Sequence, residues 1–307
     1  MNRTVLITGA NAGLGKEAAR QVALLPETEK VILAVRNVQK GEVAKKELEQ
    51  KTGKDIFELL IMDVSDLDSV RNAIPQIEKP IDAVILNAAG MGGRTPRAKT
   101  KAGVTTIFAA NVLGHALFVE ELLKEDKLKN VVMYASSEAV RGVKRMGIPR
   151  PDLKSSSAEE FASIFDGSWF GEKIDQMQAY SLVKYGATLW MSKLAREYPN
   201  IKFISMSPGG TRGTNAMDDI PAPMKIMFKY IMFPFVMPMM GLIHSLETGA
   251  RRYVKAITDE SLESGVFYAS QGSGTTGLVI DQATIFPKLA DTRVQDNAYE
   301  AVHRFLN

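Results

Sequence analysis

The sequence contains no cysteine. Disulfides and thiolate metal sites are therefore excluded, and a cytoplasmic compartment is the default expectation. His, Asp and Glu form no cluster with metal-ligand spacing, so metal catalysis is not supported. Neither sign of charge predominates, with 38 Lys and Arg against 35 Asp and Glu. The net charge of +3 is spread evenly along the chain and does not suggest a nucleic-acid partner.

Long hydrophobic runs are missing too. No window offers ~18 uninterrupted apolar residues, so we expect no helix that spans a membrane. The opening MNRTVLITGA leads straight into a strand-like segment and lacks the character of a signal or transit peptide. With 24% charged and 45% hydrophobic residues, the composition is that of a globular protein with a substantial core.

Short β-branched runs alternate along the chain with longer patterns typical of amphipathic helices. This alternation predicts crossover units and a doubly wound parallel sheet with helices on both faces. No linker divides the chain, so residues 1–307 are interpreted as one α/β domain. It carries an insertion at 138–172, an irregular stretch at 209–245 and a C-terminal extension at 271–307. The expected strands are VLIT at 5–8, VILAV at 31–35, LLIMDV at 59–64, AVILNAA at 83–89, VVMYAS at 131–136 and KFISMS at 202–207.

The first expected strand ends in TGANAGLG, residues 8–15, and a helix opens at Lys16. Glycines let the backbone turn tightly and approach a pyrophosphate, whose charge is stabilised at a helix N-terminus. A glycine-rich turn alone is a weak signal, but its place between the first strand and the first helix makes it much stronger. The sequence therefore predicts a Rossmann-type dinucleotide site with contacts from Gly9, Asn11, Ala12, Gly13, Leu14 and Gly15.

The end of the second strand indicates which dinucleotide binds. An acidic residue there would accept hydrogen bonds from a ribose 2′-hydroxyl, whereas an arginine accommodates a 2′-phosphate. Here the strand ends in AVRN, with Arg36 and Asn37 and no acid beside them. The guanidinium fork suits a phosphate. We expect NADP(H) as the cofactor.

The motif YSLVK, residues 180–184, lies in a helical pattern. A spacing of four places Tyr180 and Lys184 on one helix face, one turn apart. A neighbouring cation favours phenolate, so we expect Lys184 to lower the pKa of Tyr180 and to make it a usable proton donor and acceptor. Ser136 and Ser137 end a preceding strand, at the carboxyl edge where ligands bind in open α/β sheets.

Together these motifs resemble the signature of the short-chain dehydrogenases/reductases. The resemblance covers nearly the whole chain, to about residue 270. It implies a hydride exchanged between a nicotinamide and a carbonyl, an alcohol or an activated C=C carbon. The matching motifs are, in order, TGANAGLG, DV at 63–64, NAAG at 87–90, Asn111 in NVLGH, Ser137, YSLVK and SPGG at 207–210.

The resemblance also implies roles for individual residues. Tyr180 would be the general acid/base, and Lys184 would lower its pKa and hold the nicotinamide ribose. Ser137 would hydrogen-bond the substrate oxygen, with Ser136 as the alternative. Asn111 would anchor a water in a proton relay. The cofactor groove would be lined by Asp63, Val64, Asn87, Ala88, Ala89, Gly90, Pro208, Gly209 and Thr211.

Two positions depart from a simple match. The threonine that the family places five residues after the proline is Gly213 here, so either Thr211 or Thr214 would contact the nicotinamide carboxamide. His115 follows Asn111 in a long helical pattern, and we interpret it as a packing residue rather than a catalytic one.

Tyr180 follows Ser137 by 43 positions, far more than in most members of the family. Both ends of this insertion are anchored at the site, so it must bulge over it. The stretch ETGARRYVKAITDESLESGVFYAS, residues 247–270, resembles protochlorophyllide reductases and the long retinol-dehydrogenase-like enzymes. Those enzymes act on large apolar molecules, and the resemblance therefore implies a lipophilic small-molecule substrate.

The segment KIMFKYIMFPFVMPMM, residues 225–240, holds five Met and three Phe but only two charges. A helix from Pro223 to Phe233 would rise only ~15 Å, about half of a bilayer core, so it cannot span. A helix packed on the domain is one interpretation. Its place after SPGG favours the other, an adaptable apolar lid over the substrate. Shallow membrane contact through 224–240 is a secondary expectation.

Other functions are compatible with the same residues. One is a double-bond reductase similar to protochlorophyllide reductase, although the cysteines of those enzymes are absent. Another is a sensor or scaffold that binds NADPH without turnover, and a third is a peripheral membrane protein that docks through residues 224–240. The sequence leaves open whether the protein is a monomer or a homo-oligomer.

Overall fold

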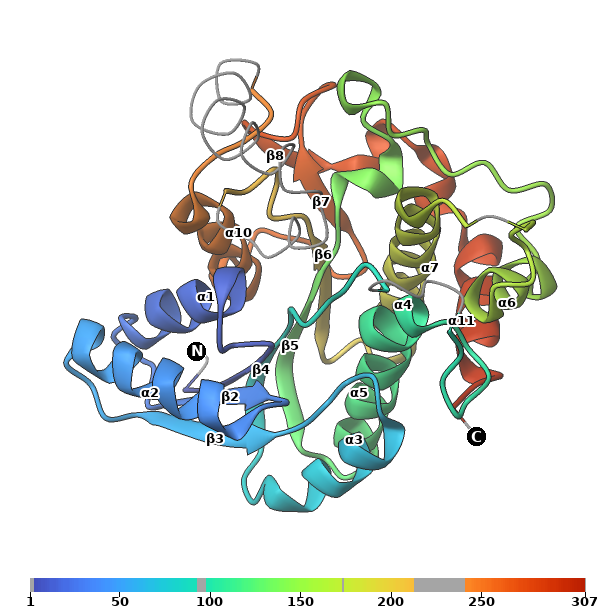
Figure 1. Ribbon diagram of the computed structural model, residues 1–307. Coiled ribbons are helices and arrows are strands. Elements are labelled where there is room, and N and C mark those ends of the chain that lie inside the picture. Colours follow the sequence, from blue (N-terminus) through green and yellow to red (C-terminus); the bar gives the residue numbers. More distant parts are fainter. Residues whose placement is uncertain (1–2, 93–97, 173, 213–240, 307) are drawn as a thin grey trace, which may run out of the picture.

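The computed structural model describes residues 3–92, 98–172, 174–212 and 241–306. Within them the strands form one sheet of eight in the order β3-β2-β1-β4-β5-β6-β7-β8 (Figure 1). Strands β1 to β7 are parallel, and β8 pairs antiparallel with β7. The strands are β1 Thr4–Thr8, β2 Lys30–Val35, β3 Phe57–Ile61, β4 Ile81–Leu86, β5 Leu128–Ala135, β6 Lys202–Met206, β7 Phe267–Ser270 and β8 Val279–Asp281.

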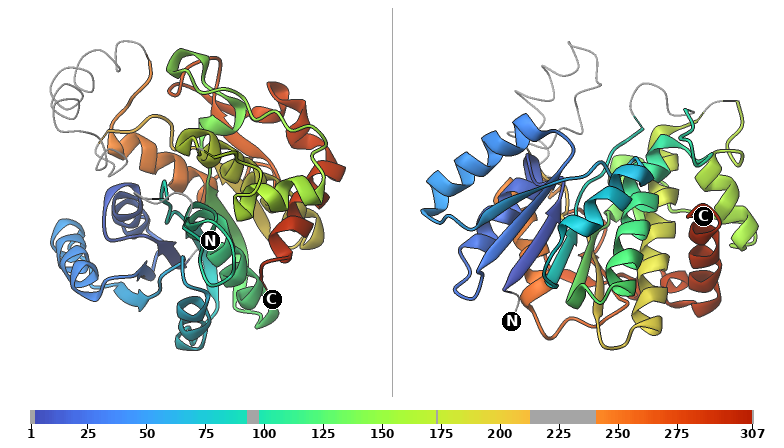
Figure 2. Two further views of the ribbon diagram at one scale, coloured as in Figure 1. Left: turned by 45° about the vertical axis from the view of Figure 1, so that its right-hand side comes forward. Right: turned by 90° about the horizontal axis from the view of Figure 1, so that it is seen from below.

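Helices cover both faces of the sheet (Figure 2). One face carries α1 Gly13–Ala23, α2 Val38–Thr52 and α10 Leu246–Thr258. The other carries α3 Leu67–Ala73, α5 Gly114–Lys124 and α7 Gln176–Glu197. A short helix, α4 Thr106–Phe108, and a π-helical turn, Ala109–Leu113, lead into α5. The expected doubly wound α/β fold is confirmed.

The strand sequences explain why the sheet is covered on both sides. Successive side chains of a strand point to opposite faces. In β1, Val5 and Ile7 pack into the hydrophobic cluster under α1 and α10, while Leu6 packs into the cluster under α5 and α7. All three are 0% exposed. Strands of this kind are apolar at nearly every position, which is the pattern that predicted them.

Side-chain caps define where most of the long helices begin. Asn37, Asp175 and Ser245 accept hydrogen bonds from the first-turn N–H groups of α2, α7 and α10. Helix α1 differs, because its N-cap residue is Ala12, whose side chain offers no acceptor. The N-terminal N–H groups of α1 therefore remain available to a ligand at the end of β1.

Two expected strands end three residues earlier than the sequence suggests. The apolar run at 59–64 forms β3 only to Ile61, and the run at 83–89 forms β4 only to Leu86. After Leu86 the chain leaves the sheet because the N–H groups of Asn87 and Ala88 both donate to Thr8 Oγ1, at 2.9 Å. The sequence analysis assigned no strand to β7 or β8.

The C-terminal extension contains α11 Thr292–His303, which packs on α7 and on α6 Ala158–Asp166 of the insertion. Figure 2 shows α11 beside α6 on this side of the molecule. Arg196 of α7 lies 2.6 Å from Asp296, and His303 lies 2.6 Å from Glu120 of α5. Helix α11 thereby occupies the outer face of α7.

One described run, Thr106–Lys124, is long and apolar enough to cross a membrane by length and composition alone. It is 72% buried inside the fold, and this core position accounts for its apolar character. The segment 225–240, together with the lid and the membrane contact expected there, lies outside the described residues.

Candidate active site

Six neighbouring strands of the sheet, β3 to β6 in spatial order, have their carboxyl ends at one edge (Figure 1), and the expected site residues follow these ends in the sequence. The strand order reverses between β1 and β4, and ligands of open α/β sheets bind at such a switch point. Residues that follow the strand ends are, from β3 across to β6, Asp63, Arg36, Gly9, Asn87, Ser137 and Pro208.

The loop after β1 requires glycine at three positions, two because of their backbone conformation and one because of close packing. Gly9 has a φ of +66°, and Gly13 a φ of +55°, in the region that favours glycine. At Gly15, a Cβ would lie 2.5 Å from both Gly9 O and Asn87 Nδ2. Asn87 Nδ2 donates to Thr8 O at 2.9 Å, which locks the β4 loop onto the β1 loop. This arrangement lets the backbone approach a phosphate.

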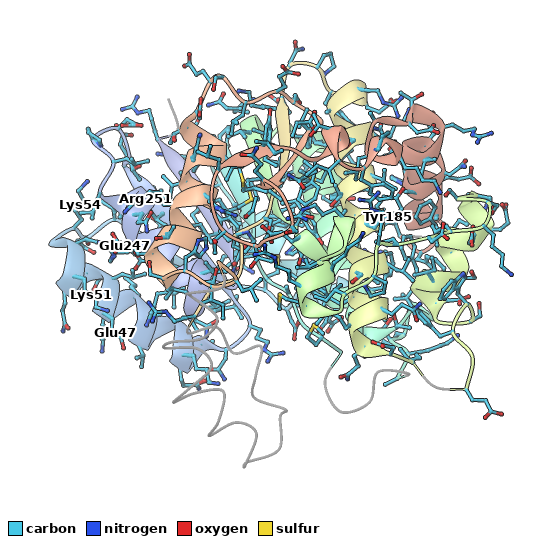
Figure 3. All side chains as sticks on the ribbon, turned by 90° about the horizontal axis from the view of Figure 1, so that it is seen from above. Glu47, Lys51, Lys54, Tyr185, Glu247 and Arg251 are labelled. Carbon is cyan, nitrogen blue, oxygen red and sulfur yellow. The ribbon has the colours of Figure 1, made fainter. Side chains whose placement is uncertain are left out.

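The loop is flanked by charged helices. Lys16, at the start of α1, lies 2.7 Å from Glu47 of α2. Figure 3 shows Glu47 on α2 and the pair Glu247 and Arg251 on α10 on one side of the molecule, with Tyr185 of α7 on the other. Helices α2 and α10 thus lie on one face of the sheet and α7 on the other.

The residues expected around the adenosine lie after β2 and β3. Arg36 is exposed. Asn37 was expected to contact the cofactor. In the structure its side chain caps α2, because its Oδ1 accepts a hydrogen bond from Lys40 N at 2.8 Å. Asp63 Oδ1 accepts from Ser65 N at 2.9 Å and from Ser65 Oγ at 2.6 Å, which fixes the turn after β3. Val64 is buried against Gly114, where a Cβ would meet Val64 O.

Asn111 lies in the π-helical turn and is fully buried. Its Nδ2 donates to Gly90 O and to Ile107 O, both at 2.7 Å. Its Oδ1 accepts no hydrogen bond from the described residues. A buried acceptor of this kind suits an ordered water. Asn111 thus bridges the NAAG loop and the core helix.

His115 is also fully buried and is hydrogen-bonded on both ring nitrogens. Nε2 lies 3.0 Å from Thr8 Oγ1, and Nδ1 lies 3.3 Å from Asn111 O. Burial, aided by the charge of Lys184, lowers the pKa of His115 to about 3. The ring is therefore neutral and connects the β1 end to the π-turn, a more specific role than the packing that we expected.

The structure separates the two serines. Ser136 is buried, with its Oγ 2.8 Å from Thr188 Oγ1 of α7. Ser137 instead hydrogen-bonds Tyr180 and caps the following 3₁₀ helix, Glu138–Arg141. Ser137 rather than Ser136 thus stands beside the Tyr180 hydroxyl.

Tyr180 and Lys184 lie on one face of α7, but their electrostatics differ from the expectation. Burial raises the pKa of Tyr180 to about 12, with the Ser137 hydrogen bond acting in the opposite direction. Burial lowers the pKa of Lys184 to about 7. Lys184 Nζ donates to Ala135 O at 2.8 Å and lies 5.6 Å from the centre of the Tyr180 ring. Lys184 therefore faces the ring, and the expected lowering of the Tyr180 pKa is wrong for this arrangement.

The loop after β6 completes the edge. Gly209 has a φ of +77° and donates its N–H to Ser207 Oγ at 3.1 Å. Pro208 O lies 2.6 Å from His244 Nε2. Thr211 Oγ1 donates to Gly209 O at 3.1 Å. Thr214, the alternative for the carboxamide contact, lies outside the described residues.

The insertion packs directly on Tyr180. Ala139, Val143 and Ile148 form a small buried hydrophobic cluster against the tyrosine ring. Val143 and Ile148 pair as an isolated antiparallel bridge, so this part of the insertion is a tight turn. Its tip exposes Met146, which is 42% accessible.

The sequence analysis missed one charged pair behind the site. Glu138, directly after Ser137, lies 3.4 Å from Arg252 of α10, and both side chains are buried. Glu138 lies at the start of the insertion and Arg252 in the stretch 247–270, but neither was given a role, and 114 positions separate them. A charged residue directly after the serine pair was a signal that could have drawn attention to Glu138.

The family described as short chain dehydrogenase matches residues 3–147. Mouse retinol dehydrogenase 13 is 32% identical over 199 residues, which cover 63% of this chain and 53% of that protein. Protochlorophyllide reductase B of Oryza sativa subsp. japonica is 27% identical over 293 residues, covering 87% of this chain and 69% of the other. The chain thus spans only about half the length of the first of these relatives.

Solved structures share the fold at low identity. NADPH-bound carbonyl reductase from chicken fatty liver superposes with a TM-score of 0.59 at 16% identity, covering 91% of this chain and 94% of the other. NADPH-dependent 3-quinuclidinone reductase from Rhodotorula rubra gives 0.60 at 19% identity, covering 86% and 88%. At this identity the likeness supports the fold alone.

Proposed function

The chain belongs to the short-chain dehydrogenases/reductases, a family of oxidoreductases, and on that premise we propose that it transfers a hydride between NADPH and a bulky apolar substrate. The reacting group is a carbonyl or the corresponding alcohol, with Tyr180 as the general acid/base. The observation that carries the proposal is the Ser137–Tyr180–Lys184 group at the carboxyl edge of β5.

The phosphate loop fits a dinucleotide. No side chain fits at Gly15, and Ala12 leaves the first N–H groups of α1 without a side-chain cap. Such N–H groups bind a pyrophosphate. When bound, the cofactor would supply the hydride. Gly9, Gly13 and Gly15 would hold its phosphates, and Asn87 keeps the two loops together.

The proton is handled by the chain itself. In the reducing direction the Tyr180 hydroxyl donates a proton to the substrate oxygen, while Ser137 hydrogen-bonds that oxygen and orients it. A pKa of about 12 keeps Tyr180 protonated at neutral pH and ready to donate. The Tyr180 hydroxyl then has to be reprotonated. We propose that this proton passes through Lys184, whose pKa is lowered to about 7, and through a water held by Asn111, whose Oδ1 accepts no hydrogen bond from the described residues.

The preference for NADPH rests on Arg36. We expect Arg36→Ala to weaken NADPH binding by about 10- to 100-fold, because a charge-assisted hydrogen bond contributes about 1.5–3 kcal/mol. NADH binding should change little. Fluorescence titration with both cofactors measures the effect.

Arg293→Ala, which removes an exposed arginine from α11, is the matched control and should leave both affinities unchanged. A wild-type protein that binds NADH more tightly than NADPH would overturn the assignment.

The apolar substrate class is supported by described residues near Tyr180. Met177 is 38% exposed and lies three positions before Tyr180, hence on the same face of α7. Met146 is exposed at the tip of the turn that packs on Tyr180. Methionine gives an adaptable apolar surface. We expect this surface to contact a lipophilic substrate.

Met177→Ser should raise KM for long-chain aldehydes by about 5-fold, because part of the ~1.5–3 kcal/mol from burying a methionine is lost. KM for a small polar aldehyde should hardly change. Val43→Ser serves as the control, since Val43 is exposed on α2. Equal increases for both substrates would remove the support for an apolar site here.

A second candidate is reduction of an activated double bond. It is favoured by the long alignment with protochlorophyllide reductase B, which covers 87% of this chain. The same Tyr180 hydroxyl would then protonate carbon instead of oxygen. Membrane contact through 224–240 stays a prediction, because those residues lie outside the described part of the chain.

A further inference from the structure

Glu138 carries a carboxylate that is buried next to Ser137. Its side chain is 4% exposed and receives several donors. Ser207 Oγ donates to Oε2. Ser270 donates to Oε1 twice, from Oγ at 2.9 Å and from its backbone N at 3.3 Å. Ser207 after β6 and Ser270 at the end of β7 are thus both hydrogen-bonded to Glu138, the residue that follows Ser137.

Arg252 supplies the opposite charge from α10 and is 6% exposed. Besides Glu138, its guanidinium donates to Ser207 O at 3.3 Å, to Ser270 Oγ at 3.0 Å and to Gly277 O at 3.0 Å. It also lies against the tight loop, since a Cβ at Gly209 would be 2.9 Å from Arg252 Nη1. One ion pair therefore links three adjacent strand ends to one helix.

Stability alone is a weak explanation for this pair. Removing two charges from water is costly, and buried ion pairs can often be replaced by apolar residues without loss of stability. What this pair does provide is a fixed geometry. Ser207 is the key link, because its Oγ donates to Glu138 and accepts the N–H of Gly209. The carboxylate thus reaches the backbone of the Pro208–Gly209 loop through one hydroxyl.

We propose that the Glu138–Arg252 pair, acting through Ser207, is a positioning device that fixes the Pro208–Gly209 loop relative to Ser137. Ser137 and this loop follow neighbouring strands and flank the same part of the edge. Their separation sets where a cofactor lies relative to a substrate held by Ser137. The catalytic meaning of the device rests on the proposed hydride transfer, but its effect on cofactor binding does not.

The groups that face Glu138 come from every element packed around it. They are Arg252 and Tyr253 of α10, Tyr180 of α7, Arg141 of the adjoining 3₁₀ helix, and His244 before α10. The charge of Glu138 contributes to the raised pKa of Tyr180. Arg252 pairs with the Glu138 carboxylate at 3.4 Å.

The test measures NADPH affinity by fluorescence titration, and kcat and KM with an aldehyde, in wild type, Ser207→Ala, Glu138→Gln and the double variant. Ser192→Ala is the matched control, because Ser192 is a buried serine of α7 that donates to Gly265 O at 2.6 Å, outside the site. Ser207→Ala leaves the ion pair itself intact, so it should fold.

We expect Ser207→Ala to weaken NADPH binding about 10-fold and to lower kcat more than it changes the KM of the aldehyde. Glu138→Gln should weaken binding at least as much. The double variant should bind NADPH no more weakly than Glu138→Gln does, because the effects of substitutions at residues that act as one unit are not additive. Ser192→Ala should bind NADPH as wild type does.

Additive losses, or a Ser207→Ala protein indistinguishable from Ser192→Ala, would overturn the proposal. If Glu138→Gln fails to fold, the comparison of the two serine variants decides alone. If NADPH affinity responds as expected but wild type converts no substrate, the proposed function fails and the positioning device stands. If wild type is active and Ser207→Ala retains its affinity and kcat, only the device fails.

Discussion

Tyr180→Phe should lower kcat by about 10²- to 10⁴-fold, the range that a positioned general acid contributes. Phenylalanine keeps the ring that packs on Ala139, Val143 and Ile148, so the fold and the apolar wall should persist. Only the hydroxyl beside Ser137 is lost. Steady-state kinetics with an aldehyde, together with an NADPH titration that should stay close to wild type, measure the effect.

Tyr185→Phe is a matched control on the same helix. Tyr185 is buried and its hydroxyl has no hydrogen-bond partner among the described residues. Its ring stacks with Phe286 at 5.4 Å between centres, a contact that phenylalanine retains. This variant should keep wild-type kcat. Turnover that survives Tyr180→Phe undiminished would contradict the mechanism.

Gly15→Ala should weaken NADPH binding by at least about 10-fold, that is about 1.4 kcal/mol or more. The added methyl would lie 2.5 Å from Gly9 O and from Asn87 Nδ2, and the backbone atom has no freedom to swing away. The phosphate loop or the Asn87 side chain must shift. Either movement disturbs the approach of the backbone to the pyrophosphate. Fluorescence titration and urea unfolding separate lost affinity from lost stability.

Gly171→Ala is the control for this substitution. A Cβ at Gly171 meets no atom of the described residues within 4 Å. Its affinity for NADPH should equal that of wild type. Unchanged affinity in Gly15→Ala would show that the cofactor does not use this loop, and would remove the basis for the dinucleotide site.

Sequence periodicity was sufficient for the central sheet because each buried strand is apolar on both faces. Val5, Leu6 and Ile7 are divided between two hydrophobic clusters, and their continuous apolarity is visible in the sequence. Strands β7 and β8 were missed because four and three residues carry too little pattern. The early end of β4 depends on long-range hydrogen bonds such as Ala88 N to Thr8 Oγ1.

In the site, too, some features could be predicted from the sequence and others could not. The four-residue spacing was enough to place Tyr180 and Lys184 on one helix face. Their pKa values could not be predicted, because burial dominates them and burial is a property of the fold. Glu138 and Arg252 meet only when α10 packs beside β5 and β6, so no local pattern connects them.

The central claim is tested most directly by NADPH consumption with purified wild-type protein across aldehydes, ketones, quinones and enones of graded chain length. The account predicts NADPH oxidation in equal amount to reduced product, with the highest kcat/KM for bulky apolar carbonyl compounds. Tight NADPH binding without turnover of any compound in this panel would contradict it, and would identify the chain as a non-catalytic NADPH-binding protein.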